Sequence, residues 1–489
     1  MDVATGGTLV AVLNENDAAE LDLHLSDRIR LKRGRKETIA VVDFAESKKA
    51  VPRGRIGLFE EVLSKLNAKS GDEVSVFIGE KPESLWYIKK KLDGKELDYK
   101  DIKSIIDDTV SNSLTTVELA YYVAANYMGG MSTRETVALT KAMINTGDKL
   151  QFRGKVIDKH CIGGVAGNRT TPIVVPILAA AGLKVPKTSS RSITSPAGTA
   201  DMMEVLTDVE ISTKRIMRIV DKTNACLVWG GAVDLAPADD KIIKVEHPLS
   251  IDAPGQLLAS IMAKKGSVSA THVIIDIPVG RDSKIESRKE ALRLKRGFEN
   301  LGKVLNMKVK VILTDGSQPV GRGMGPVLEA IDVLDVLKNN PEAPPDLRKK
   351  SLRMAGLLLE MTGKAGKGEG RGLAKRIVDS GDAYRKFMQI IMAQGAKETD
   401  EKNLKPGPYH FDVKADKKGK VANISNVAMS KIARIAGSPA DKGSGIYLHK
   451  KKGDSVAKGE KIFTIYSKSS QKLKFALNVL EERDGFVIS

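Results

Sequence analysis

The spacing of hydrophobic and polar positions changes along the chain, and these changes predict its domains. From residue 1 to about 84, apolar and polar residues alternate in short segments, which indicates strands. Residues 21–31 and 66–76 share one pattern, a helix end followed by a turn and an alternating segment. Two such halves predict a small, pseudo-symmetric, β-barrel-like N-terminal domain without free sheet edges.

From about residue 85 the spacing becomes helical. Thr115-x-x-Glu118 and Ser132-x-x-Glu135 each place a hydroxyl three residues before a carboxylate and ahead of apolar positions at helical spacing. This arrangement is typical of a capping box, in which side chains satisfy the first backbone N–H groups of a helix. Gly147 follows as a stop signal.

Apolar strands then alternate with helices. The segments are a strand at Lys155–Asp158, a helix at 172–181, and strands at His272–Val279 and Val309–Leu313. The alternation predicts an α/β domain with a mainly parallel sheet. Gly363–Gly372 is rich in glycine and basic residues and predicts a mobile loop, either a lid over anions or a flexible tether. From about residue 411, Val-rich strands and turns predict a second small unit.

Composition limits the class of protein. With 489 residues, 42% of them hydrophobic, the chain is long enough for several domains with their own cores. The longest nearly apolar run, 172–183, is too short to cross a membrane, and the N-terminus has no signal pattern, so we expect a cytoplasmic protein. Two cysteines and six histidines without metal-ligand spacing predict no disulfide framework and no metal site.

The charge indicates anionic partners. Lys and Arg number 79 against 61 Asp and Glu, a formal net charge of +18. Aromatic residues make up only 4% and no nucleic-acid-binding motif is present, so a small phosphorylated substrate is favoured over nucleic acid. Scattered lysine pairs are typical of a solvated surface.

The first chemical motif runs from Asp158 to Pro172. A strand end, three glycines and a helix opened by Pro172 bring backbone N–H groups and the positive end of the helix dipole together, which favours an anion. Lys159 adds a positive charge. The spacing is not that of a P-loop, and a glycine-rich turn without a ligand remains an alternative.

The second and third motifs supply further polar groups. Lys187–Ser195 holds six hydroxyl residues and two cations before a Pro-Ala-Gly turn, a density suited to sugar and phosphate oxygens, although a solvated Ser-rich turn has the same composition. Downstream, Ser260 and Lys264 share one helix face. Lys284 follows a strand at the carboxyl edge of the predicted sheet, where open α/β sheets bind ligands.

Gly321–Pro326 looks like a dinucleotide fingerprint. Its third glycine falls one position early, and Pro326 occupies the expected place, so a nicotinamide cofactor is not expected.

Together the motifs resemble the nucleoside phosphorylases of the thymidine phosphorylase superfamily and, within it, the archaeal AMP phosphorylases, over essentially the whole chain. The residues that carry the resemblance are Asp158-Lys159-His160 with Gly163-Gly164, Thr188–Asp201, Asp234–Asp239, Ser260–Lys265 and Gly321–Pro326. The resemblance implies an α/β protein of the type II nucleoside phosphorylase fold. Its expected parts are a barrel-like domain at 1–84, a helical domain at 85–152 plus about 235–268, an α/β phosphate-binding domain at 153–234 plus 269–410, and an α+β domain at 411–489.

The resemblance also implies an activity. Phosphate attacks C1′ of a nucleoside 5′-monophosphate, preferably AMP but also CMP or UMP, and releases the base and ribose 1,5-bisphosphate without metal or cofactor. The implied proton donor is Asp252, which the local pattern alone would make a helix N-cap. A homodimer or larger homo-oligomer is expected. The implied substrate contacts are Gly164, Ser190, Arg191, Ser192, Ile193, Thr194, Ser195, Thr199, Ser260 and Lys284, with Lys159 for phosphate.

Two departures bear on the substrate. Cys161 stands where phosphorylases of unphosphorylated pyrimidine nucleosides commonly have Ser, and the arginine with which they hold the base is missing near Val245-Glu246. Thymidine is therefore disfavoured. The alternatives are such a pyrimidine nucleoside phosphorylase, a phosphoribosyltransferase with Asp239-Asp240 as its magnesium pair, and a non-catalytic nucleic-acid binder.

Overall fold

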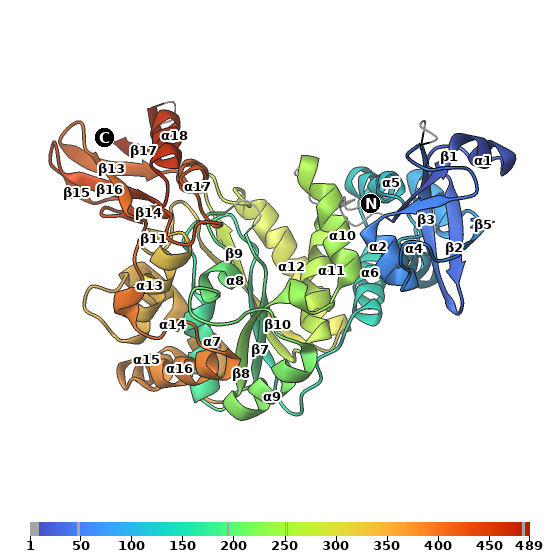
Figure 1. The fold of residues 1–489 in the computed structure, drawn as a ribbon. Helices are drawn as coiled ribbons and strands as arrows, with labels where there is room; N and C mark the ends of the chain where they lie inside the picture. The colour runs from blue at the N-terminus through green and yellow to red at the C-terminus, as the bar shows by residue number, and fades with distance from the viewer. Residues whose placement is uncertain (1–8, 46–48, 193–194, 250, 252, 482–484) are drawn as a thin grey trace. The chain divides into compact units, whose positions relative to one another are not determined.

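The computed structural model describes residues 9–45, 49–192, 195–249, 251, 253–481 and 485–489 (Figure 1). The chain divides into two compact units, Met1–Gly147 with Ala236–Ala263, and Asp148–Leu235 with Lys264–Ser489. Among the described residues, no helix has both the length and the apolar character needed to cross a membrane.

A five-stranded sheet with two helices forms the N-terminal part of the first unit. Its elements are β1 (Val10–Asn14), α1 (Glu15–Glu20), β2 (Arg28–Arg33), β3 (Lys36–Ala45), β4 (Ile56–Leu58), α2 (Glu60–Leu66) and β5 (Ser75–Ile78). The strand order is β4-β1-β3-β2-β5. β1 and β3 are parallel and the other pairs are antiparallel. This order does not establish closure of the sheet, so the barrel-like shape stays a prediction.

The internal repeat is visible in two matching turns. Before β2, the backbone N–H of His24 donates to the carboxylate of Asp27 at 2.7 Å, and before β5 the N–H of Lys69 donates to Asp72 at 2.7 Å. In both copies an Asp side chain therefore closes the turn between a helix end and a strand.

The rest of the first unit is helical. Its helices are α3 (Ser84–Leu92), α4 (Tyr99–Ser111), α5 (Thr116–Gly129), α6 (Thr133–Thr146), α10 (Pro237–Glu246), the 3₁₀ segment η2 (His247–Leu249) and the first part of α11 (Pro254–Ser267). The apolar faces of the α-helices share one core.

Both predicted capping boxes are confirmed. At α5 the Thr115 hydroxyl accepts from the N–H of Glu118 at 3.2 Å, and the Glu118 carboxylate accepts from the N–H of Thr115 at 2.8 Å. Ser132 and Glu135 repeat this at α6. Gly147 ends α6 as predicted, although in an extended conformation.

A parallel sheet organises the second unit. Its strands are β6 (Ile157–Cys161), β7 (Val185–Ser189), β8 (Ala225–Trp229), β9 (His272–Val279) and β10 (Lys308–Asp315). The ladders β10-β9-β6 and β7-β8 are parallel, and a parallel bridge between Val156 and Lys184 joins them. The predicted strand at 272–279 is confirmed, and the one at 309–313 lies within β10. The predicted strand at 155–158 overlaps β6, which begins two residues later. β7 and β8 were not predicted.

Helices pack on this sheet or on one another around it (Figure 1). They are α7 (Thr171–Ala180), α8 (Thr199–Met203), α9 (Thr213–Thr223), α12 (Arg288–Val304), α13 (Pro326–Leu337), α14 (Pro345–Met361), α15 (Gly370–Asp379) and α16 (Asp382–Gln394), with 3₁₀ segments η1 (Gly230–Ala232) and η3 (Glu401–Asn403). The prediction of a loop over 363–372 is wrong for its second part, because α15 begins at Gly370. A Cβ at Gly370 would lie 2.1 Å from the Gly356 carbonyl oxygen, so glycine lets these two helices pack closely.

The C-terminal domain is an α+β unit, as predicted. It contains β12 (Tyr409–Lys414), β13 (Gly419–Ile424), α17 (Asn426–Ile435), β14 (Gly445–Leu448), β15 (Ser455–Val456), β16 (Lys461–Ser467), α18 (Ser470–Glu481) and β17 (Phe486–Ile488). One sheet has the order β11-β14-β16-β12, the other β15-β13-β17. β11 (Gly323–Met324) belongs to the Gly321–Pro326 motif, which therefore adds a strand to the C-terminal sheet.

Candidate active site

The carboxyl end of β6 leads into the glycine-rich loop, which we define as residues 162–170. Gly163, Gly164 and Gly167 all have positive φ angles, and α7 begins directly afterwards with Pro172 in its first turn. The loop therefore passes from strand to helix N-terminus as predicted.

Lys159 lies on β6, just before this loop. The residue is 2% exposed, and its Nζ donates to the Thr170 hydroxyl at 2.7 Å and to Thr171 at 3.3 Å. Burial lowers the pKa of Lys159. An ammonium group and two hydroxyls thus converge at the start of α7, the combination expected of an oxyanion site.

Buried carboxylates hold further lysines nearby. Asp158, 1% exposed, pairs with Lys265 Nζ at 2.6 Å and with Lys187 Nζ at 3.3 Å. Burial alone would raise the pKa of Asp158, but the charges of Lys187 and Lys265 outweigh it and hold that pKa below its ordinary value. Burial lowers the pKa of Lys265 to about 8.

A second buried pair completes the cluster. Lys350 Nζ lies 3.0 Å from Asp276, which also accepts from the Thr314 hydroxyl at 2.6 Å. The negative charge of Asp276 favours the protonated form of Lys159 and so opposes the lowering of its pKa by burial. We call Lys159, Lys187, Lys265, Lys350, Asp158 and Asp276 the lysine cluster. Three of its ammonium groups pair with the two carboxylates, and that of Lys159 donates to hydroxyls instead. The cluster therefore carries two net positive charges when all six groups are ionised.

Two neighbours of Lys159 stay uncharged. Burial and then the charges of Lys265 and Lys187 hold the pKa of His160 well below its ordinary value. Burial raises the pKa of the Cys161 thiol, whose sulfur accepts from the Asn168 amide at 3.2 Å. Cys161 is therefore a neutral thiol.

Gly164 and Lys284 lie against each other, although 120 positions separate them in the sequence. A Cβ at Gly164 would be 2.1 Å from the Lys284 backbone nitrogen. Lys284 is exposed in the loop after β9, as predicted. The glycine-rich loop thus brings these two predicted contact residues together.

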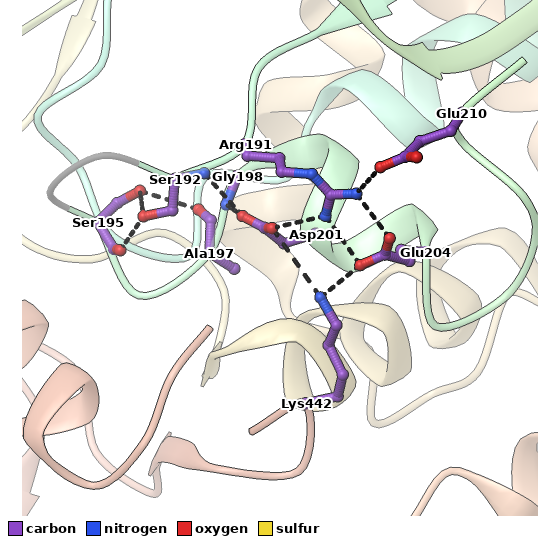
Figure 2. Close-up of polar contacts among 9 residues, drawn as sticks. All are labelled: Arg191, Ser192, Ser195, Ala197, Gly198, Asp201, Glu204, Glu210 and Lys442. Atoms are coloured by element: carbon purple, nitrogen blue, oxygen red, sulfur yellow. Dashed lines mark hydrogen bonds and ion pairs between the residues drawn. The ribbon is translucent and has the colours of Figure 1, made fainter. Parts of the chain in front are cut away.

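We define the hydroxyl-rich loop as residues 190–198, of which the structure describes 190–192 and 195–198. Both described parts of this loop are held by Asp201. One carboxylate oxygen of Asp201 accepts from the N–H groups of Ser192 at 2.7 Å and Gly198 at 2.8 Å (Figure 2). Ser195 donates its hydroxyl to the Ala197 carbonyl at 2.9 Å. The carboxylate therefore ties the beginning of the loop to its end.

Arg191 lies within this loop, and Thr199 directly follows it. Arg169 Nη1 donates to the Thr199 hydroxyl at 3.3 Å, and the Arg169 guanidinium also contacts the buried Glu329. The Arg191 guanidinium is held by carboxylates, so a phosphate would compete with them for it. Its role as a phosphate ligand stays a prediction.

Other predicted residues lie elsewhere or outside the description. Ser260 is half-buried on the part of α11 that belongs to the first unit. Ser190 is exposed at the end of β7. Ile193, Thr194 and the implied proton donor Asp252 lie outside the described residues.

Two residues were missed by sequence reasoning. Ser189 ends β7 with a buried hydroxyl that has no hydrogen-bond partner among the described residues, and its place in the hydroxyl run was the available signal. Asn426, at the start of α17, accepts from the N–H of Ala166 at 3.2 Å and donates to the Gly316 carbonyl at 2.9 Å. The C-terminal domain thereby supports the glycine-rich loop, which no local pattern indicates.

Three family models match the chain. They are the helical bundle domain of a glycosyl transferase family over residues 86–147, the a/b domain of the same family over 153–268, and the C-terminal domain of pyrimidine nucleoside phosphorylase over 420–484.

Curated relatives match almost the whole length. A putative thymidine phosphorylase of Legionella pneumophila is 46% identical over 94% of this chain and 88% of its own length. An AMP phosphorylase of Methanocaldococcus jannaschii is 44% identical over 96% of this chain and 93% of its own, and one of Methanococcoides burtonii is 44% identical over 100% and 96%. Among solved structures, anthranilate phosphoribosyltransferase from Thermus thermophilus has a TM-score of 0.54 at 19% identity over 63% of this chain and 99% of its own, a likeness of fold.

Proposed function

The chain belongs to the nucleoside phosphorylase family that includes the archaeal AMP phosphorylases, and from this membership we propose that it cleaves nucleoside 5′-monophosphates with inorganic phosphate. It is a pentosyltransferase. AMP is the preferred substrate, CMP and UMP are further substrates, and the products are the free base and ribose 1,5-bisphosphate.

The lysine cluster is the observation that carries the proposal. A buried excess of two positive charges is costly by itself, and an anion with two negative charges neutralises it. Inorganic phosphate near neutral pH carries about that charge. Lys159, with the Thr170 and Thr171 hydroxyls, would hold the attacking phosphate.

The chemistry requires charge stabilisation on both sides of the sugar. As a phosphate oxygen attacks C1′, the bond from C1′ to the base nitrogen breaks, and its electron pair leaves with the base. The sugar carries positive charge in this transition state, which the adjacent phosphate stabilises. The departing base takes up a proton, and we assign Asp252 as its donor.

The nucleotide contacts follow from the two loops. The proximity of Gly164 and Lys284 supports a common role in binding the nucleotide, with Lys284 near its 5′-phosphate. Further nucleotide contacts are proposed for the hydroxyl-rich loop, for Thr199 after it and for Ser260 on α11. The loop residues proposed to bind the sugar, the phosphate or the base are Ser190, Arg191, Ser192, Ile193, Thr194 and Ser195.

Two competing functions have weaker support. For a phosphoribosyltransferase that holds magnesium with Asp239 and Asp240, the first side chain is buried and the second exposed, which opposes joint binding of one ion. For a phosphorylase of unphosphorylated nucleosides, the neutral thiol of Cys161 replaces the usual hydroxyl. Action in the cytoplasm as a homodimer or larger homo-oligomer, and a barrel-like N-terminal domain, remain parts of the proposal.

The test is base release from AMP, CMP, UMP and GMP, with adenosine and thymidine as controls, each with and without inorganic phosphate. We expect phosphate-dependent release from the monophosphates and much slower release from the nucleosides. Release that is indifferent to phosphate would identify a hydrolase, and preference for thymidine would identify a pyrimidine nucleoside phosphorylase.

A further inference from the structure

Arg191, within the hydroxyl-rich loop, is the centre of a network of ion pairs. Its guanidinium binds Glu204 through two nitrogens, at 2.7 and 2.8 Å, and binds Glu210 at 2.8 Å (Figure 2). It also lies 3.4 Å from Asp201 and over the Trp229 ring, 4.8 Å from the ring centroid. The bidentate contact with Glu204 and the face of the Trp229 ring together fix the plane of the guanidinium.

Lys442 brings the C-terminal domain into this network. Its Nζ lies 2.6 Å from Glu204 and 4.0 Å from Asp201 (Figure 2). Its own backbone is anchored, because the Lys442 carbonyl accepts from the N–H of Val327 in the first turn of α13 at 3.1 Å. The lysine thus connects the segment after α17 to the residues that follow the hydroxyl-rich loop.

Asp201 connects this network to the backbone of the loop. The same carboxylate that faces Arg191 and Lys442 accepts the N–H groups of Ser192 and Gly198. A Cβ at Gly198 would lie 2.5 Å from the Ser190 carbonyl oxygen, so the two ends of the loop are in close contact. Displacement of Asp201 would therefore change the position of the loop's hydroxyl groups.

The charge of the network favours a structural role over anion binding. Two cations, Arg191 and Lys442, face three carboxylates, Asp201, Glu204 and Glu210, which leaves one negative charge. This excess disfavours a phosphate at the Arg191 guanidinium itself, so any phosphate contact of this loop would come from its hydroxyl and backbone N–H groups. The hydrogen bond from Arg191 and then that from Lys442 lower the pKa of Glu204 to about 2, so its ion pairs persist over the working pH range.

We propose that Lys442 is a positioning residue through which the C-terminal domain fixes the hydroxyl-rich loop for the nucleotide, by way of Glu204 and Asp201. The choice of nucleotide as the affected ligand rests on the proposed function. The dependence of the loop conformation on Lys442 does not rest on the proposed function.

The decisive comparison uses Lys442→Met and Lys442→Arg, with Lys450→Met as the matched control. Lys450 also pairs with a glutamate in the C-terminal domain, Glu460 at 2.5 Å, and its side chain is 22% exposed against 31% for Lys442. In the part of the chain that the structure describes, no hydrogen bond or ion pair joins Lys450 to the hydroxyl-rich loop.

Kinetics give the first readout. Because small misplacements of binding groups are costly, Lys442→Met should raise the KM for AMP about tenfold, with a smaller change in the KM for phosphate. In Lys442→Arg the KM for AMP should stay within about threefold of the wild-type value, and in Lys450→Met it should change less than about twofold. The double variant Glu204→Gln with Lys442→Met should raise the KM for AMP by less than the product of the two single effects.

Amide hydrogen exchange gives a readout that needs no activity. In the ligand-free protein, Lys442→Met should accelerate exchange in a peptide covering 190–201, which includes the Ser192 and Gly198 amides, and leave a peptide from β9 unchanged. Lys450→Met should accelerate neither.

The outcomes separate the two proposals. Wild-type exchange in Lys442→Met, or a KM for AMP that rises equally in Lys450→Met, would overturn the positioning role. If the wild-type protein does not phosphorolyse AMP, the proposed function fails, and the exchange comparison alone decides whether Lys442 positions the loop.

Discussion

Replacement of Gly164 by alanine tests whether the glycine-rich loop and Lys284 form one binding surface. Gly164 and Gly163 are adjacent and have similar positive φ angles, +84° and +97°. A Cβ at Gly164 would lie 2.1 Å from the Lys284 nitrogen, whereas a Cβ at Gly163 would have nothing within 4 Å. Gly163→Ala is therefore a control for backbone strain alone.

The expected magnitude follows from this contact. Both variants carry the strain of a non-glycine residue at positive φ, about 1 to 3 kcal/mol. Only Gly164→Ala must also separate the two backbones by roughly 1 Å to reach an ordinary van der Waals distance, and a displacement of that size costs roughly 100-fold in rate. We expect kcat/KM for AMP to fall about 100-fold in Gly164→Ala and less than about tenfold in Gly163→Ala.

The assay combines steady-state phosphorolysis with urea unfolding. Urea unfolding defines conditions in which both variants are fully folded, and kcat/KM is compared under those conditions. A larger fall in Gly164→Ala would then report the displaced Lys284 loop, and equal kcat/KM values of the two folded variants would refute the reasoning that Gly164 and Lys284 act together.

Four further predictions concern single side chains. Since the pKa of Lys265, about 8, lies below its ordinary value of 10.5, the unfolded chain binds this proton more tightly, and the free energy of unfolding should rise by about 3 kcal/mol as pH goes from 8 to 10.5. Lys265→Met should lack that part of the rise in pH-dependent urea unfolding. Asp252→Asn should lower kcat about 10²- to 10⁴-fold while isothermal titration still detects AMP binding, and an unchanged kcat would exclude Asp252 as proton donor. Asn426→Ala leaves the Ala166 N–H without its acceptor, so it should lower the free energy of unfolding by about 1 to 3 kcal/mol and raise the KM for phosphate. Because burial raises the pKa of Cys161, iodoacetamide should label it slowly at pH 8, and Cys161→Ser should retain phosphorolysis; rapid labelling would contradict the burial argument.

Local patterns predicted what local interactions determine. The capping boxes of α5 and α6 and the start of α7 depend on residues within a few positions of one another, and all were recognisable. A third capping box, between Asp98 and Asp101 at α4, was missed because it has aspartate where the usual pattern has Glu or Gln. β7 was missed because Pro186 and Lys187 interrupt its apolar pattern.

Long-range partners were beyond the reach of such patterns. The sequence indicated anion binding for Lys159 and Arg191, but the partners that decide the roles of these two residues come from distant segments. Lys159 donates to the Thr170 hydroxyl and is influenced by the negative charge of Asp276, whereas the partners of Arg191 leave a negative excess when Lys442 is included. The sign of each side chain's charge could be predicted from the sequence, but the net charge around each residue depends on the fold.

The measurement that tests the central claim most directly is the identity of the sugar product. AMP and inorganic phosphate, incubated with the protein, would be followed by ³¹P nuclear magnetic resonance together with adenine release. The account predicts that one phosphate is consumed for each adenine released and that the new sugar carries two phosphorus signals, from C1 and C5. Ribose 5-phosphate with a single signal, and no consumption of phosphate, would contradict it.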